Sequence, residues 1–244
     1  KAGHAGTLDP AATGILLILL GRATKLSPFL TGLDKAYKVE ALLGRITDTY
    51  DLDGNLVEER GVEGIGMDGI ESVVKEFMGS QIQKPPVFSA VKVNGKRLYK
   101  LARKGIVVEP PEREISIYGL KILSYQPPVL DLAVECSSGT YLRSLVSDIG
   151  ARLGCGACVQ SLVRTRVGPF SLDQAVEMDE LEDIVKNGRA NGIIRSPFQA
   201  LCHLPAAVVS REKIQKVRNG SRIPLDWIKD SETELKEGMK FRVA

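Results

Sequence analysis

The spacing of apolar positions divides much of the chain into strands and helices. The segment 36–44 is apolar at every second position from Tyr37 to Leu43, and 130–136 alternates in the same way, a period typical of strands with one buried face. The aliphatic run 15–20 predicts a buried strand. Helical spacing over 67–78 and 142–153 predicts two amphipathic helices, the second ending at Gly154, and 22–30 is compatible with a short helix. Strands and helices mix without strict βαβ repetition, which predicts an α+β fold with a mixed, largely antiparallel sheet flanked by helices.

A basic stretch interrupts this pattern between two proline pairs, at 85–86 and 110–111. Its apolar stripe is thin, so it predicts an insertion at about 85–113 that rests on the body of the protein and turns its cations toward a partner. The candidate phosphate contacts are Lys92, Lys96, Arg97, Lys100 and Arg103. For any one of them, an ordinary solvated side chain is an equal alternative.

A second boundary falls near 202–205. Beyond it we expect a short helix over 210–219 and a final strand over 240–243. This tail is too short to bury a good core of its own. We therefore predict a main domain over 1–204 and a small C-terminal domain over 205–244.

Composition and charge narrow the range of partners. The chain has 244 residues, 43% hydrophobic and 26% charged, and no apolar run approaches the length of a membrane span. A net charge of +3 and a pI near 8.6 permit a nucleic-acid partner without requiring one. Cys155 and Cys158 form a lone CxxC with no second pair of metal ligands. We expect free thiols, no metal site and a reducing, cytoplasmic setting.

The segment 3–14 is the strongest candidate for chemistry. It holds three glycines, His4 and the pair Asp9-Pro10. Glycine lets the backbone bend, and Pro10 biases Asp9 toward an extended conformation. The result is a rigid turn that presents one carboxylate, which suits a nucleophile. Alternatively, Asp9 caps a helix with Pro10 at its first position.

The same segment resembles the Gly-His-x-Gly-x-Leu-Asp-Pro-x-Ala-x-Gly motif of the TruB family of tRNA pseudouridine synthases. Four further segments extend the resemblance in the expected order, so that it covers positions 3 to 170. They are Lys-Ala-Tyr-Lys-Val at 35–39, Pro-Pro-x-x-Ser-Ala-x-Lys-x-x-Gly-x-x-x-Tyr-x-x-Ala-Arg at 85–103, Ser-Gly-Thr-Tyr-Leu-Arg-Ser-Leu at 138–145, and Leu-Val-Arg at 162–164 followed by Val-Gly-Pro-Phe at 167–170. The tail from about Pro205 resembles the start of a PUA RNA-binding domain. The resemblance implies the pseudouridine synthase fold with an RNA-gripping insertion and a partial PUA-like β domain.

The resemblance also implies roles for individual residues. Asp9 corresponds to the nucleophile, and Arg143 is the candidate to hold it ionised and oriented. Tyr37 is expected to stack on the target base, Tyr141 and Leu162 to line the pocket, and His4 to help hold the nucleotide flipped out. From the residues alone, a solvated arginine is the favoured interpretation of Arg143. Tyr37 and Tyr141 are then packing aromatics, and His4 is a turn histidine.

The implied reaction is the isomerisation of uridine 55 in the T arm of tRNA. The N1–C1′ bond breaks and the base rejoins through C5, so no metal or organic cofactor is required. Whether Asp9 engages C1′, the base or a sugar proton stays open. We expect a monomer that binds tRNA and no membrane. The rivals are a tRNA-folding chaperone without catalysis and a hydrolase, which needs a second carboxylate; Glu40 and Asp48 have no particular claim to that role.

The chain departs from the family pattern at both ends. The family has some tens of residues before the Gly-His motif, including a Lys-Pro-x-Gly-x-(Ser/Thr)-Ser segment, and a longer C-terminal module. We therefore expect the catalytic domain to be N-terminally incomplete and the PUA-like domain to be truncated.

Overall fold

The computed structural model describes residues 1–89, 91–93, 95–102, 104–106 and 108–243. The chain forms two compact units, which are described separately. The larger unit comprises His4–Ile18 and Thr31–Asp173. The smaller unit comprises Lys1–Gly3, Leu19–Leu30 and Gln174–Ala244.

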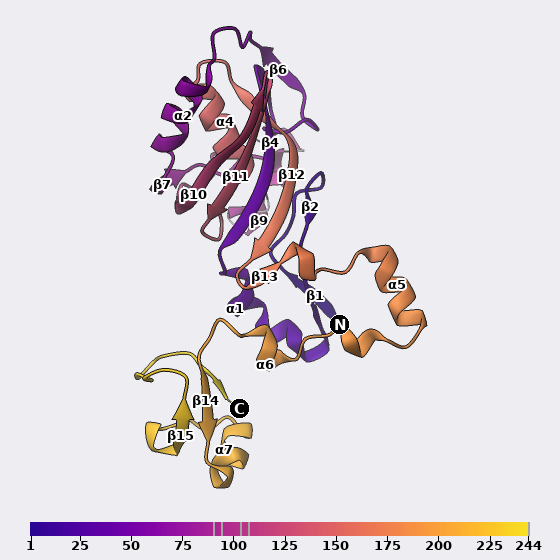
Figure 1. Ribbon diagram of the computed structural model, residues 1–244, viewed down its shortest axis with the longest axis vertical. Helices are drawn as coiled ribbons and strands as arrows, with labels where there is room; N and C mark the ends of the chain where they lie inside the picture. Colours follow the sequence, from indigo (N-terminus) through magenta and orange to yellow (C-terminus); the bar gives the residue numbers. More distant parts are fainter. Residues whose placement is uncertain (90, 94, 103, 107, 244) are drawn as a thin grey trace. The chain divides into compact units, whose positions relative to one another are not determined.

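The larger unit is built on a sheet that has seven strands among the described residues, in the order β13-β12-β4-β11-β10-β7 with β2 beside β12 (Figure 1). The β2–β12 pair is parallel, and the other pairs are antiparallel. This confirms the predicted α+β class with a largely antiparallel sheet. The strands are β2 Thr13–Gly14, β4 Lys35–Leu43, β7 Gly79–Gln83, β10 Arg113–Gln126, β11 Val129–Cys136, β12 Ala157–Val167 and β13 Phe170–Ser171.

Two helices, α2 (Met67–Glu76) and α4 (Leu142–Arg152), cover one face of this sheet (Figure 1). Alternate residues of β4 and β11 point into the core beneath them, Val39 and Leu132 among them, and Ile70 and Ile149 meet them from the helices. The predicted strands over 36–44 and 130–136 are confirmed, as are the helices over 67–78 and 142–153. The core therefore forms where period-2 strands and period-3.6 helices face each other.

The prediction of a buried strand over 15–20 is wrong in part. The strand β3 covers Leu17–Leu20 and pairs with β1 (Ala2–Ala5) in a separate two-stranded sheet. Leu19 is 5% exposed, whereas Ile18 and Leu20 are 58% and 55% exposed. Successive side chains of a strand point to opposite faces, so this short strand buries every second residue although all its residues are apolar.

The basic insertion is the connection between two paired strands. Gln83 at the end of β7 pairs with Arg113 at the start of β10, and the chain between them leaves the sheet and returns. Lys84 forms ion pairs with Glu109 at 2.9 Å and Glu112 at 3.6 Å, which link the two ends of the insertion. Within it lie β8 Lys92–Val93, β9 Lys96–Arg97 and α3 Leu98–Ala102.

The remaining elements are short. β5 Arg45–Thr47 and β6 Leu56–Glu59 form a hairpin in the larger unit. The predicted helix over 22–30 is a 3₁₀ turn followed by α1 Ser27–Thr31. The smaller unit contains α5 Met178–Lys186, α6 Pro197–Ala200, α7 Ile214–Arg218, and a sheet of β14 Ala206–Val209, β15 Ile228–Ser231 and β16 Arg242–Val243. Every helix in the described part of the chain is too short or too polar to span a membrane.

Candidate active site

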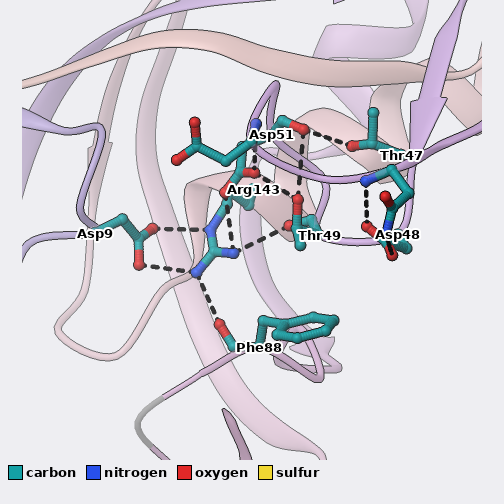
Figure 2. A network of polar contacts seen from close by, with 9 residues as sticks. Asp9, Thr47, Asp48, Thr49, Asp51, Phe88 and Arg143 are labelled. Carbon is teal, nitrogen blue, oxygen red and sulfur yellow. Dashed lines mark hydrogen bonds and ion pairs between the residues drawn. The ribbon is translucent and has the colours of Figure 1, made fainter. Parts of the chain in front are cut away.

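Arg143, in the first turn of α4, grips the carboxylate of Asp9 with two parallel hydrogen bonds. Nε donates to Oδ2 and Nη2 donates to Oδ1, each at 2.8 Å (Figure 2). The arginine side chain is 5% exposed and the aspartate side chain 35% exposed. Charge-assisted bidentate pairs fix orientation as well as charge. The structure thus presents one accessible carboxylate in a set direction.

The guanidinium is held from its other sides as well. Nη1 donates to the carbonyl of Thr49 at 3.0 Å, and Nη2 donates to the carbonyl of Phe88 at 3.1 Å. Nη1 also lies 3.2 Å from Oδ2 of Asp51 (Figure 2). These four hydrogen bonds and one ion pair match the five N–H donors of an arginine in number. These contacts fix the orientation of the guanidinium, which in turn fixes the orientation of the Asp9 carboxylate.

Asp51 is a site residue to which none of the sequence motifs assigns a role. Its side chain is 13% exposed. Oδ1 accepts from the Thr49 hydroxyl at 2.5 Å and from the backbone N–H of Asp53 at 3.2 Å. Both oxygens of Asp51 are thus engaged, while Asp9 stays more accessible. A turn aspartate carries no local signal that it will meet an arginine on a distant helix.

A cleft of about 250 Å³ opens beside this network. Its charged residues are Arg143 and three aspartates, Asp9, Asp51 and Asp53, and Leu162 supplies part of an apolar wall. The cleft is lined by Asp9, Ala11, Ala12, Asp51, Leu52, Asp53, Arg143, Val159, Gln160, Ser161 and Leu162. The other two carboxylates considered for a second role are elsewhere engaged: Glu40 accepts from Gln160, and Asp48 accepts from Asn55.

Three predicted site residues are not among those that line the cleft. Tyr37 lies on β4 and packs against the core; burial raises the pKa of its phenol to about 12, and the charge of Asp9 acts in the same direction. Tyr141 directly precedes α4, and Arg113 lies over its ring at 5.5 Å. His4 is exposed on β1. Their functional roles remain predictions.

A buried glutamine fixes the start of the helix that carries Arg143. The Gln83 side chain accepts from the backbone N–H of Tyr141 at 2.8 Å and donates to its carbonyl at 3.1 Å. Ser144 donates to the carbonyl of Lys84 at 2.8 Å. The edge strand β7 thereby anchors the N-terminal turn of α4.

The predicted RNA contacts gather on the insertion. Lys96, Arg97 and Lys100 line a hollow of about 510 Å³ together with Lys104. Lys92 lies in β8, but its side chain is outside the described part of the structure, as is Arg103. A hollow lined by several cations suits a phosphate backbone.

Cys155 and Cys158 are free and buried, and burial raises the pKa of both thiols. Within the described ranges, no three His, Cys, Asp or Glu residues come close enough together to hold a metal ion.

Comparison with known proteins identifies the family. Residues 1–142 match the model of the TruB family pseudouridylate synthase N-terminal domain, and residues 143–201 match that of the tRNA pseudouridylate synthase B C-terminal domain. A tRNA pseudouridine synthase B of Dehalococcoides mccartyi strain 195 is 42% identical over 226 residues, which cover 93% of this chain and 75% of that protein. One of Heliobacterium mobile is 45% identical over 223 residues, 90% of this chain and 71% of that protein.

Solved structures show the same fold. A chain of a Cbf5–Nop10–Gar1 complex superposes with a TM-score of 0.77 at 28% identity, covering 100% of this chain and 66% of that one. A chain of an H/ACA RNP bound to a substrate RNA containing 2′-deoxyuridine gives 0.75 at 25% identity, with 100% and 65% covered. The family matches together span most of the sequence and include Asp9 and Arg143. The chain belongs to the TruB family of pseudouridylate synthases.

Proposed function

We propose that this protein isomerises uridine 55 in the T arm of tRNA to pseudouridine, with Asp9 as the nucleophile. The observation that carries the proposal is the accessible Asp9 carboxylate gripped by the buried Arg143. A nucleophile that must not rotate needs such a partner. The names of the relatives, tRNA pseudouridine synthase B, support the choice of tRNA as substrate.

The reaction conserves every heavy atom of the nucleotide. The N1–C1′ bond breaks, the uracil turns, and a C5–C1′ bond forms. The proton on C5 is then lost to a base or to solvent, and N1 gains one. Asp9 is regenerated at the end, so the cycle needs no metal, organic cofactor, oxidant or reductant.

The size of the cleft favours a base taken out of its helical stack. About 250 Å³ lies just below the usual range of ligand pockets and is too small for a paired stem. In this proposal Leu162 forms a wall of the uracil pocket, Tyr37 stacks on the ring, and Tyr141 lines its edge. His4 occupies space that the extruded nucleotide vacates.

Two further parts of the molecule, the insertion and the C-terminal domain, bind RNA in this proposal. The basic hollow of the insertion binds the phosphates of the T arm through Lys96, Arg97 and Lys100, with Lys92 and Arg103 as further contacts. A catalytic domain over 1–204 carries the chemistry, and the PUA-like domain over 205–244 adds an RNA contact. We place the enzyme in the cytoplasm as a monomer.

A hydrolase fits the site less well. It needs a carboxylic acid that can give a proton to the leaving group. Asp51 is the nearest second carboxylate in the network, and its oxygens accept from Thr49 and Asp53 and pair with Arg143. Both oxygens of this second carboxylate are therefore already engaged with protein partners.

Product analysis tests the proposal. A T-arm stem–loop is incubated with the wild type and with Asp9→Asn, then digested to nucleosides; a stem–loop with cytidine at the target position is the substrate control. We expect pseudouridine from the wild type alone. Free uracil would make the protein a hydrolase, and unchanged RNA that binds tightly and salt-sensitively would make it a chaperone.

A further inference from the structure

We infer that Arg164 is a positioning residue for this reaction. Its guanidinium hydrogen-bonds to both ends of the loop that carries Asp9, residues 6–15, here called the Asp9 loop. The inference rests on the proposed function of Asp9. Arg164 does not line the cleft; it acts through the backbone of the loop, and its guanidinium also hydrogen-bonds to the side chain of Tyr37. It is distinct from Arg143, which binds the Asp9 side chain itself.

Arg164 is the largest fully buried side chain of the described core, at 1% exposure. No carboxylate in the described ranges forms an ion pair with it. Burying a charge is costly unless it is paired or fully hydrogen-bonded. The charge of Arg164 is compensated by hydrogen bonds to three backbone carbonyls and to the Tyr37 side chain.

The carbonyls that accept hydrogen bonds from Arg164 belong to the Asp9 loop. Nη2 donates to Gly6 at 3.2 Å, Nη1 to Thr7 at 3.4 Å and Nε to Ile15 at 2.8 Å. Two of these residues precede Asp9 and one follows it. The three nitrogens of one rigid fork therefore set the separation of the two ends of the loop.

The backbone of Arg164 holds the same loop. The N–H of Ile15 donates to the Arg164 carbonyl at 2.9 Å, and β2 pairs with β12 at Val163 and Arg164. Inside the loop, the N–H of Ala12 donates to the Asp9 carbonyl at 3.0 Å. The side chain and the backbone of Arg164 thus hold the loop on both sides of Asp9.

A purely structural role explains the arrangement poorly. Burial, together with the nearby charge of Arg164, lowers the pKa of a second buried cation, Lys35. The Lys35 ammonium is engaged with the carbonyls of Thr31 and Leu33. Two neighbouring buried cations oppose each other, and an apolar side chain would fill the core at lower cost. What an apolar residue cannot supply is three donors in a fixed plane.

The consequence is an effect on rate rather than on binding. The basic insertion is a separate part of the larger unit, so RNA affinity does not depend on the clamp. A loop displaced by about 1 Å costs about 100-fold in rate, because the reacting atoms must be aligned. Lysine keeps the charge but has a single nitrogen, which cannot reach carbonyls on both sides of the loop.

The test compares Arg164→Lys and Arg164→Met with two matched variants, Arg166→Lys and Arg166→Met. Arg166 lies on the same strand but pairs with the exposed Glu135. Single-turnover reactions with enzyme in excess give a rate constant and an amplitude, RNA anisotropy gives Kd, and thermal melting gives the folded fraction. We expect about a 100-fold lower rate constant for Arg164→Lys, a Kd within about 3-fold of wild type and full amplitude. The Arg166 variants should stay within about 2-fold.

Each other outcome has a definite meaning. A reduced amplitude with an unchanged rate constant means that Arg164 only supports folding, and this overturns the inference. So does a rate constant within about 3-fold of wild type. If Arg164→Met fails to fold, Arg164→Lys still decides. If wild type and Arg166→Lys make no pseudouridine either, the proposed function has failed, and not this inference alone.

Discussion

At the scale of single residues, the site divides two tasks between two side chains: Asp9 faces the substrate, and Arg143 holds Asp9 in place. Asp9 stays accessible enough to meet a substrate, while Arg143 is buried and bound on every side. Burying the arginine holds the carboxylate still and leaves it open to the cleft. Burying the charge of Arg143 costs free energy, which its hydrogen bonds and ion pairs to two carboxylates and two carbonyls offset.

We expect Arg143→Lys to lower the single-turnover rate by about 10²- to 10³-fold, because a lysine cannot form the bidentate pair and reach Thr49 and Phe88 as well. The affinity for RNA should change by less than about 5-fold. Arg152→Lys, at the exposed end of the same helix, is the control. A rate within 5-fold of wild type for Arg143→Lys would show that orientation by the guanidinium is unimportant.

Tyr37 gives a prediction for stability against pH. Burial raises the pKa of its phenol to about 12 in the folded protein, against an ordinary value of 10.0. The folded state therefore holds its proton more tightly than the unfolded state. The resulting stability, on the order of 2 kcal/mol, is present below pH 10 and is lost as the pH rises from 10 to 12.

Urea unfolding of the wild type and of Tyr37→Phe between pH 8 and pH 11 measures this effect. The wild type should lose stability relative to the variant only above about pH 10, since the other tyrosines contribute equally to both proteins. A constant difference across the range would mean that the phenol is not desolvated.

At the scale of elements, the Asp9 loop depends on the close approach of β2 to β12. Gly14 has φ +101°, and a Cβ placed there would lie 2.3 Å from the carbonyl oxygen of Arg164. Only glycine combines this conformation with this contact. The glycine thus permits the parallel pairing through which Arg164 reaches the loop.

Gly14→Ala should therefore cost about 2–4 kcal/mol in the free energy of unfolding, from steric overlap and backbone strain together. Gly64→Ala is the matched control, because Gly64 has φ +83° but no atom within 4 Å of an added Cβ. It should lose about 1 kcal/mol from strain alone. Chemical denaturation measures both, and equal losses would mean that the contact with β12 is unimportant.

The same elements show how far alternation in a sequence predicts strands. β4 and β11 keep strict alternation and pair without a break in register, and the sequence analysis finds both. The long strands β10 and β12 are missed. Each carries two register shifts in its pairing, between Ile117 and Gly119 and between Ile122 and Ser124 in β10, and between Val159 and Ser161 and between Arg164 and Arg166 in β12. A bulge moves the buried face by one residue and breaks the period on which the prediction depends.

At the scale of the whole molecule, the proposed function assigns the chemistry and most of the phosphate contacts to different side chains. The basic hollow of the insertion presents Lys96, Arg97, Lys100 and Lys104, none of which belongs to the Asp9 network. Removing one of these charges should weaken binding to any RNA of the same shape and leave the chemical step unchanged.

Salt titration of RNA binding tests this division. Lys96→Ala and Lys100→Ala should each reduce the slope of log K against log salt by about 1, and the double variant by about 2. Lys75→Ala, an exposed lysine on α2 that faces Glu71, should leave the slope unchanged. Unchanged slopes for the insertion variants would place the phosphate contacts elsewhere.

A sequence motif identifies side chains by their type and spacing, but it does not identify the backbone groups that they contact. Asp9 and Arg143 are found because they stand within distinctive strings, and the structure brings them together. The partners of Arg143 at Thr49 and Phe88 are backbone carbonyls, which every residue has, so no residue type announces them. Asp51 is hidden for a related reason, since it looks like any turn aspartate until the fold brings the helix α4 beside it.

The central claim is that Asp9 performs the chemistry of a pseudouridine synthase. Its most direct test is tritium release from a T-arm stem–loop labelled at C5 of the target uracil, because C5 must give up its hydrogen when the base is rejoined to C1′ through C5. Wild type and Asp68→Asn, an exposed aspartate at the start of α2, should release tritium at equal rates, and Asp9→Asn should release none above background. Release by Asp9→Asn at a rate comparable to wild type would contradict the account.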